Sequence, residues 1–144
     1  MSSIAVANEA ASHVLTEQDA ATILRRYQEL WNRAALDELM EGFTDDIVVE
    51  FADLPTIRGR SELEKVLRAR LARQKGYRLT KAVRFVSQAT IVGSWTADWT
   101  DSTTGRQMKG RGIEFIEMRG SKCARWEATF NAWDAEAPVR SMFT

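Results

Sequence analysis

Residues 89–134 read ATIVGSWTADWTDSTTGRQMKGRGIEFIEMRGSKCARWEATFNAWD, and this stretch predicts most of the fold. Two runs typical of turns, 101–105 and 119–122, divide it into three long segments rich in the β-branched and aromatic residues that favour strands. Four of the five tryptophans lie in these segments. We therefore expect a curved antiparallel sheet with an aromatic face that other elements must cover.

The first half of the chain supplies that cover. Thr16 and Asp19 form a capping-box pattern at the start of a helix whose apolar residues recur at three- and four-residue steps. Helices early in the chain and antiparallel strands late in it indicate an α+β fold. The remaining predicted elements are a short helix over 36–41 ended by Gly42, a strand over 46–51, a loop over 52–59, a third helix over 61–74 capped by Ser61, and a strand over 77–86 that starts after a helix stop at Gly76.

The composition limits the classes of partner. The 144 residues fit one domain, with a flexible leader expected over 1–15 and a single domain over 16–144. Twenty basic and twenty acidic residues cancel, so nucleic acid is not an expected partner, and no apolar run is long enough to span a membrane. One cysteine and one histidine argue against a disulfide, a zinc site or a haem, and favour the cytoplasm. We expect no metal and no cofactor.

Alternation along the strands predicts which side chains face the helices. In the strand near residue 95 the apolar phase contains Trp95 and Trp99, and in the last strand it contains Trp126 and Phe130. A bulge in the last strand would reverse this choice, and would turn the other phase, with Glu127 and Asn131, inward. We leave both phases open for that strand.

The strand around Glu114 is apolar on both phases. Ile113 and Phe115 share one phase, while Glu114, Ile116 and Met118 share the other. Strands of this kind are covered on both faces. A second copy of the chain would supply the second cover, so we expect a homodimer that forms through the sheet.

The element order and three segments, FTDDIVVEF (43–51), IRGRSELEKVL (57–67) and KCARWEATFNAWD (122–134), resemble the SnoaL-like group of the nuclear transport factor two-like superfamily. The resemblance implies a cystatin-like, cone-shaped barrel: a strongly curved, mainly antiparallel sheet covered by three N-terminal helices. Relatives include ketosteroid isomerases, polyketide cyclases, scytalone dehydratases, limonene epoxide hydrolases and non-catalytic binding or accessory domains.

Similarity to the ketosteroid isomerases suggests roles for individual residues. The segment RYQEL places Tyr27 at their oxyanion-hole tyrosine, and GIEFIEMR places Glu114 at their protonated aspartate. Their general-base aspartate follows a strand glutamate, but here Phe51 follows Glu50, so we reject that specific activity. Asp53, two residues further on, is the candidate replacement at the rim of the pocket.

The expected chemistry is acid–base catalysis. A carboxyl group among tryptophans has its charged form disfavoured, so we expect the pKa of Glu114 to rise and the group to donate a proton, while Tyr27 polarises a carbonyl. The alternative is a structural carboxylate paired with Arg111, Arg125 or a tryptophan N–H. The other expected pocket residues are Trp31, Phe51, Trp95, Trp99, Trp126 and Phe130, with Glu127 and Asn131 in the alternative phase.

Three functions remain open at this point. The first is a cofactor-independent isomerase, cyclase, dehydratase or hydrolase that acts on a small, largely apolar carbonyl compound. The second is a domain that binds such a molecule without turnover, and the third is an interaction domain whose cavity is filled by its own side chains. Open volume beside Glu114 would separate the first two functions from the third.

Overall fold

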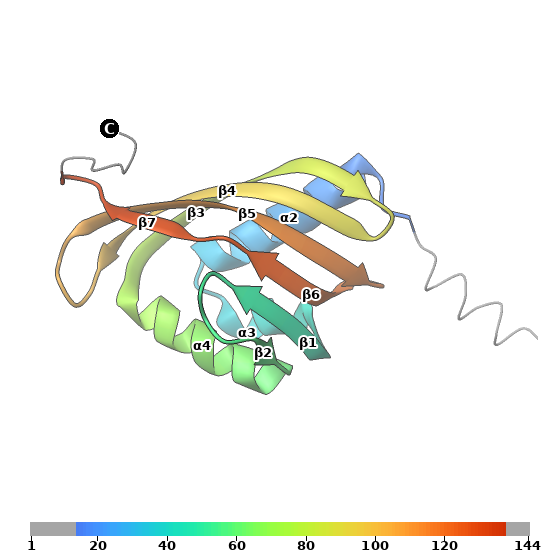
Figure 1. Ribbon diagram of the computed structural model, residues 1–144, viewed down its shortest axis with the longest axis horizontal. Helices are drawn as coiled ribbons and strands as arrows, with labels where there is room; N and C mark the ends of the chain where they lie inside the picture. The colour runs from blue at the N-terminus through green and yellow to red at the C-terminus, as the bar shows by residue number, and fades with distance from the viewer. Residues whose placement is uncertain (1–13, 138–144) are drawn as a thin grey trace, which may run out of the picture.

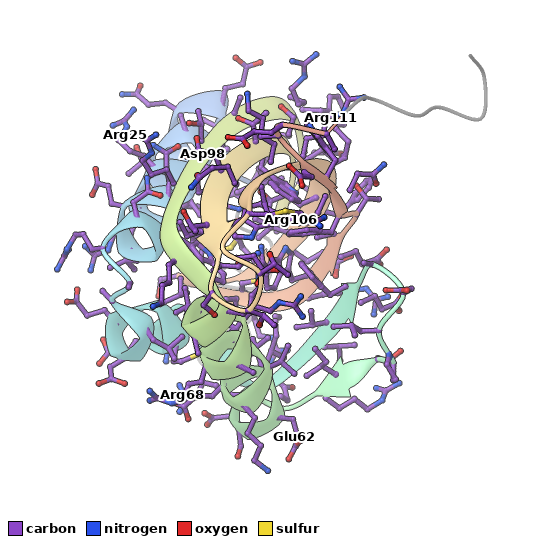
Figure 2. The ribbon with its side chains drawn as sticks, turned by 90° about the vertical axis from the view of Figure 1, so that its left-hand side faces the viewer. Arg25, Glu62, Arg68, Asp98, Arg106 and Arg111 are labelled. Atoms are coloured by element: carbon purple, nitrogen blue, oxygen red, sulfur yellow. The ribbon has the colours of Figure 1, made fainter. Side chains whose placement is uncertain are left out.

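The computed structural model describes residues 14–137, which form an α+β fold with an open, strongly curved, mostly antiparallel sheet of seven strands (Figure 1). The helices are α2 (Glu17–Asn32), α3 (Leu36–Glu41) and α4 (Arg60–Arg73). The strands are β1 (Phe43–Phe51), β2 (Ile57–Arg58), β3 (Gln74–Ser87), β4 (Thr90–Asp101), β5 (Gln107–Arg119), β6 (Lys122–Ala128) and β7 (Asn131–Asp134). Viewed from one end, the strands curl around the interior while the helices lie along one side and below (Figure 2). The predicted fold class is confirmed.

The helix starts follow different capping rules. The capping box of α2 is confirmed: the Thr16 hydroxyl accepts from the Asp19 amide at 3.0 Å, and the Asp19 carboxylate accepts from the Thr16 amide at 2.9 Å. Ser61, the predicted N-cap of α4, was wrong. The N-cap is Gly59, whose φ of +91° favours glycine, and Ser61 lies inside the helix. The predicted stop at Gly76 was also wrong, since α4 ends at Arg73 and β3 begins with the next residue.

Leu15, just before α2, packs against the rest of the fold. Leu15, the last residue of the predicted leader, is buried, and its amide donates to the carbonyl of Gln88 at 2.9 Å. This contact ties the start of α2 to the β3–β4 turn. Residues 1–13 of the predicted leader lie outside the described residues, and Val14 is exposed.

The sheet contains the predicted antiparallel meander, from β3 to β6, and two features that were not predicted. Strand β1 pairs with β6 in parallel, and the expected loop after β1 contains the short strand β2. The last predicted strand is also two strands, β6 and β7, which both pair with β5. At the break, the Thr129 hydroxyl accepts from the Ile113 amide at 2.9 Å, so a side chain replaces a backbone acceptor of the ladder.

Glycines on the inner phase of β5 make room for the tryptophans of β4. A Cβ at Gly112 would lie 2.1 Å from the Thr129 carbonyl oxygen and 2.8 Å from the ring of Trp95, and a Cβ at Gly110 would lie 3.0 Å from the ring of Trp99. Both rings are buried. Tryptophan and glycine on neighbouring strands therefore fill the interior together.

Candidate functional site

Glu114 lies at the centre of this interior, on the inner phase of β5, and is 0% exposed. Lys81 Nζ on β3 donates to both of its carboxylate oxygens, at 2.8 Å and 2.5 Å, and Trp126 Nε1 on β6 donates to one of them at 3.2 Å. The Lys81 side chain is buried as well. Strands β3, β5 and β6 thus bring together a buried ion pair and an indole N–H.

Of the structural partners suggested for Glu114, only the tryptophan N–H is confirmed. Arg111 is exposed and points away from the molecule (Figure 2), and Arg125 on β6 pairs with Glu50 and Glu127 at 2.8 Å and 2.9 Å. Lys81 was missed, although the sequence carries a signal for it. Tyr77, Leu79 and Lys81 alternate on one phase of β3, so the lysine occupies a position of the buried face.

The ion pair changes the expected role of Glu114. An ammonium within hydrogen-bond distance stabilises the ionised carboxylate. The geometry therefore favours Glu114 as a proton acceptor, rather than as the proton donor that an unpaired carboxyl among tryptophans would be. Lys81 adds a cationic donor to the same site.

Arg70 on α4 is the second cation of the interior, and it was also missed. Its Nε donates to the side-chain oxygen of Gln74 and a terminal nitrogen donates to the Tyr77 hydroxyl, both at 2.9 Å. Its guanidinium also lies over the rings of Phe51 and Phe130, at 4.8 Å from each centroid. The signal was its helical spacing, three residues after Leu67 on the apolar stripe.

Tyr27 is buried, and its hydroxyl is already bonded. It donates to the Gly42 carbonyl oxygen at 2.7 Å, an oxygen that also accepts from the Cys123 amide at 2.8 Å. Burial raises the pKa of Tyr27 well above its usual range, so it remains a neutral donor. Burial likewise raises the pKa of the Cys123 thiol to about 12, which leaves it unreactive at neutral pH.

Asp53 does not lie where the sequence placed it. Strand β1 ends at Phe51, and Ala52 takes a φ of +49°, so the extended alternation from Phe51 to Asp53 is interrupted. Asp53 is exposed and lines neither internal cavity. Its predicted orientation was wrong because the strand turns one residue before it.

The phase of the last strand is settled by burial. Trp126 and Ala128 are buried, and the ring of Phe130 packs 5.0 Å from Trp95 between centroids. Glu127 lies on the other phase, bonded to Arg125, and Asn131 is exposed on β7. The alternative phase, with Glu127 and Asn131 inward, was wrong.

Two small cavities flank Glu114, each with about 10 Å³ of space, roughly the room for one water molecule. Trp31, Lys81, Glu114 and Trp126 line both of them. The first cavity also touches Phe51, Arg70, Tyr77, Leu79 and Trp95, and the second touches Tyr27, Phe43, Ile116 and Cys123. Trp99 and Phe130 pack against this lining. Aromatic side chains therefore fill most of the interior, and a larger ligand must displace some of them.

Neither a metal cluster nor a membrane helix is found in the part of the chain that the structure describes. No group of three or more His, Cys, Asp or Glu side chains between residues 14 and 137 is placed to hold a metal ion. No helix in that range is long and apolar enough to cross a membrane.

Helices cover the inner face of the curved sheet and, with it, surround a buried charged pair. This arrangement defines a class of small α+β domains with an enclosed interior. Residues 24–126 match the model of the SnoaL-like domain, and the chain belongs to that family. No curated protein matches the chain.

Solved structures share the fold at low sequence identity. A candidate polyketide cyclase from Xanthomonas campestris pv. campestris is 18% identical with a TM-score of 0.71, over 80% of this chain and 92% of that one. A candidate isomerase from Bacillus subtilis is 19% identical with a TM-score of 0.71, over 81% and 90%. A candidate scytalone dehydratase from Novosphingobium aromaticivorans DSM 12444 is 18% identical with a TM-score of 0.67, over 83% and 87%.

Proposed function

We propose that the chain is a cofactor-independent enzyme that moves a proton on a small, largely apolar carbonyl compound bound in the interior. The buried Lys81–Glu114 pair carries this proposal. Burying two charges in an aromatic core contributes little to stability compared with apolar residues of similar size, so the pair has another use. The structural neighbours described as a candidate polyketide cyclase, a candidate isomerase and a candidate scytalone dehydratase support the same class of reaction.

In the proposed reaction, Glu114 acts as the general base. Its carboxylate accepts a proton from the carbon next to the carbonyl group, and the electron pair of that C–H bond forms an enolate. The Lys81 ammonium donates a hydrogen bond to the enolate oxygen, and Glu114 returns the proton to another carbon or releases it. Tyr27 lines the second cavity, and its hydroxyl donates to the Gly42 carbonyl rather than to the reacting group.

Deuterium exchange tests this proposal without knowledge of the natural substrate. The protein is incubated in D₂O with a panel of enolisable aromatic ketones, such as phenylacetone, and α-deuterium uptake is followed by NMR. Glu114→Gln should lower the catalysed rate by about 10²- to 10⁴-fold. Glu127→Gln, which changes a carboxylate on the outer phase, is the matched control and should leave the rate unchanged. Equal rates for the wild type and Glu114→Gln, with both proteins folded, contradict the proposal.

The small cavities favour a second candidate, an interaction domain whose interior is filled by its own side chains. About 10 Å³ on each side of Glu114 leaves no space for a ketone unless rings move. Binding separates the two candidates. A tryptophan fluorescence change on addition of aromatic ketones supports an interior that binds ligands, because four tryptophans line or pack against the cavities; the deuterium exchange above then shows whether the bound ketone turns over. If the fluorescence does not change, the interaction domain is favoured.

We also propose that a second copy of the chain covers the outer face of the sheet. Phe85, Ile113 and Phe115 are 61%, 43% and 48% exposed. Phe85 pairs with Val92, and Val92 pairs with Phe115, so both phenylalanines lie on one row across three strands. An isologous contact places this row against its own copy and removes the apolar surface from water.

A further inference from the structure

We infer that the interior selects an anionic ligand, an organic carboxylate with an aromatic or otherwise apolar body, and that Arg70 binds its carboxylate group. This inference rests on the proposed ligand-binding function and names the substrate class of that site. It starts from the charges that line the first cavity.

Three charged side chains line this cavity: Arg70, Lys81 and Glu114. Lys81 and Glu114 form an ion pair and neutralise each other. Two cations and one anion leave a single positive charge, which belongs to Arg70. Within residues 14–137, Arg70 forms no ion pair with a carboxylate.

The groups around Arg70 do not neutralise its charge. Both of its hydrogen-bond acceptors, the amide oxygen of Gln74 and the phenol of Tyr77, are neutral. The rings of Trp31, Phe51 and Phe130 attract the cation only through their π faces. Burial lowers the pKa of Arg70, although its contact with Tyr77 and, to a smaller extent, the charge of the Glu114 carboxylate oppose that shift. A partly buried cation whose contacts are all neutral is stabilised most by an anion.

Arg70 also has free donors for such an anion. A guanidinium carries five N–H donors, and the two hydrogen bonds engage Nε and one terminal nitrogen. The other terminal nitrogen has no hydrogen-bond partner among the described residues. Because Gln74, Tyr77 and the rings hold the group in place, little side-chain entropy is lost when it binds a planar carboxylate.

The walls of the cavity define the rest of the ligand. Trp31, Phe51, Trp95 and Trp126 line it, and they favour an apolar or aromatic body. A carboxylate on Arg70 directs that body toward Lys81 and Glu114, which line the same cavity. The half-buried rings of Phe51 and Phe130, which lie over the guanidinium, are the ones that must move to admit it.

Matched pairs of ligands test the inference. Benzoate, phenylacetate and cinnamate, and the three corresponding amides, are titrated into the full chain by calorimetry and tryptophan fluorescence. The carboxylates should bind at least tenfold more tightly than their amides. Arg70→Met should remove this preference. Arg68→Met, on the same helix but with its side chain directed into solvent, should retain it (Figure 2).

Each other outcome overturns a defined part of the proposal. Amides that bind as well as the carboxylates overturn the anion preference but leave the proposed binding function intact. If none of the six compounds binds, both the anion preference and the proposed binding function are overturned. A carboxylate preference that persists in folded Arg70→Met overturns the role of Arg70. If Arg70→Met does not fold, Arg70→Lys takes its place, and a preference undiminished in that variant overturns the planar guanidinium contact.

Discussion

Two neighbouring residues on β5 show how different the two faces of this sheet are. Glu114 is a carboxylate that is 0% exposed, and Phe115 is an aromatic residue that is 48% exposed. This is the reverse of the usual distribution, in which charge lies outside and large apolar groups lie inside. The inner face holds its charge because Lys81 and Trp126 pair with it.

The two faces also differ in how closely their side chains are packed. On the inner face, glycines, tryptophans and one ion pair fit together closely, so small changes there should lower the free energy of unfolding strongly. On the outer face, exposed side chains make few contacts within the chain, so changes there should affect association rather than folding. Four substitutions test this contrast, from the largest expected effect to the smallest.

Lys81→Met should have the largest effect. It leaves the Glu114 carboxylate buried without its cation, which we expect to lower the free energy of unfolding by about 3–5 kcal/mol. Urea denaturation measures this change. The control is Lys81→Met combined with Glu114→Leu, which should regain most of the loss because no charge stays unpaired. A loss below about 1 kcal/mol in the single variant would show that the ion pair is dispensable.

Gly112→Ala should have the second largest effect on stability. Its Cβ would lie 2.1 Å from the Thr129 carbonyl oxygen, a backbone atom, so β5 and the β6–β7 break must separate. We expect a loss of about 3 kcal/mol by urea denaturation. Gly110→Ala is the matched control two residues away, where the nearest atom is a tryptophan ring carbon at 3.0 Å, and its loss should be clearly smaller. Equal losses would contradict the close approach at the break.

Tyr27→Phe should lower the free energy of unfolding by only about 1 kcal/mol. The variant loses one hydrogen bond, but the Gly42 carbonyl keeps its bond from the Cys123 amide and is not left unsatisfied. The same variant separates a structural from a catalytic tyrosine. An oxyanion-hole role requires the deuterium-exchange rate to fall by about 10²- to 10³-fold, and a structural role leaves the rate nearly unchanged.

Phe115→Asp should affect folding least. For the isolated chain we expect a stability change within about 0.5 kcal/mol, because the side chain is on the surface. In sedimentation experiments the wild type should be a dimer and Phe115→Asp a monomer, while Phe115→Leu should remain a dimer. A monomeric wild type, or a dimeric Phe115→Asp, would exclude the outer face as the dimer contact.

Local patterns predicted the elements well and the site only in part. The capping box at Thr16, the apolar stripe of α2 and the meander from β3 to β6 are local or nearest-neighbour features. Glu114 was identified because a carboxylate on the buried phase of a strand is unusual. Asp53 was misplaced because a single positive φ at Ala52 ends the alternation, and the sequence carries no glycine there to reveal it.

By itself, the sequence determined the fold class, the family and the buried position of Glu114, because the periodicity of each element and the order of the elements along the chain are local features. Only the tertiary structure decided the partners of that carboxylate. Lys81 is 33 residues away from it, and strands β3 and β5 have to pair through β4 before the two side chains meet. The nearly filled interior was decided in the same way, since the fit of tryptophans over glycines depends on the register between neighbouring strands.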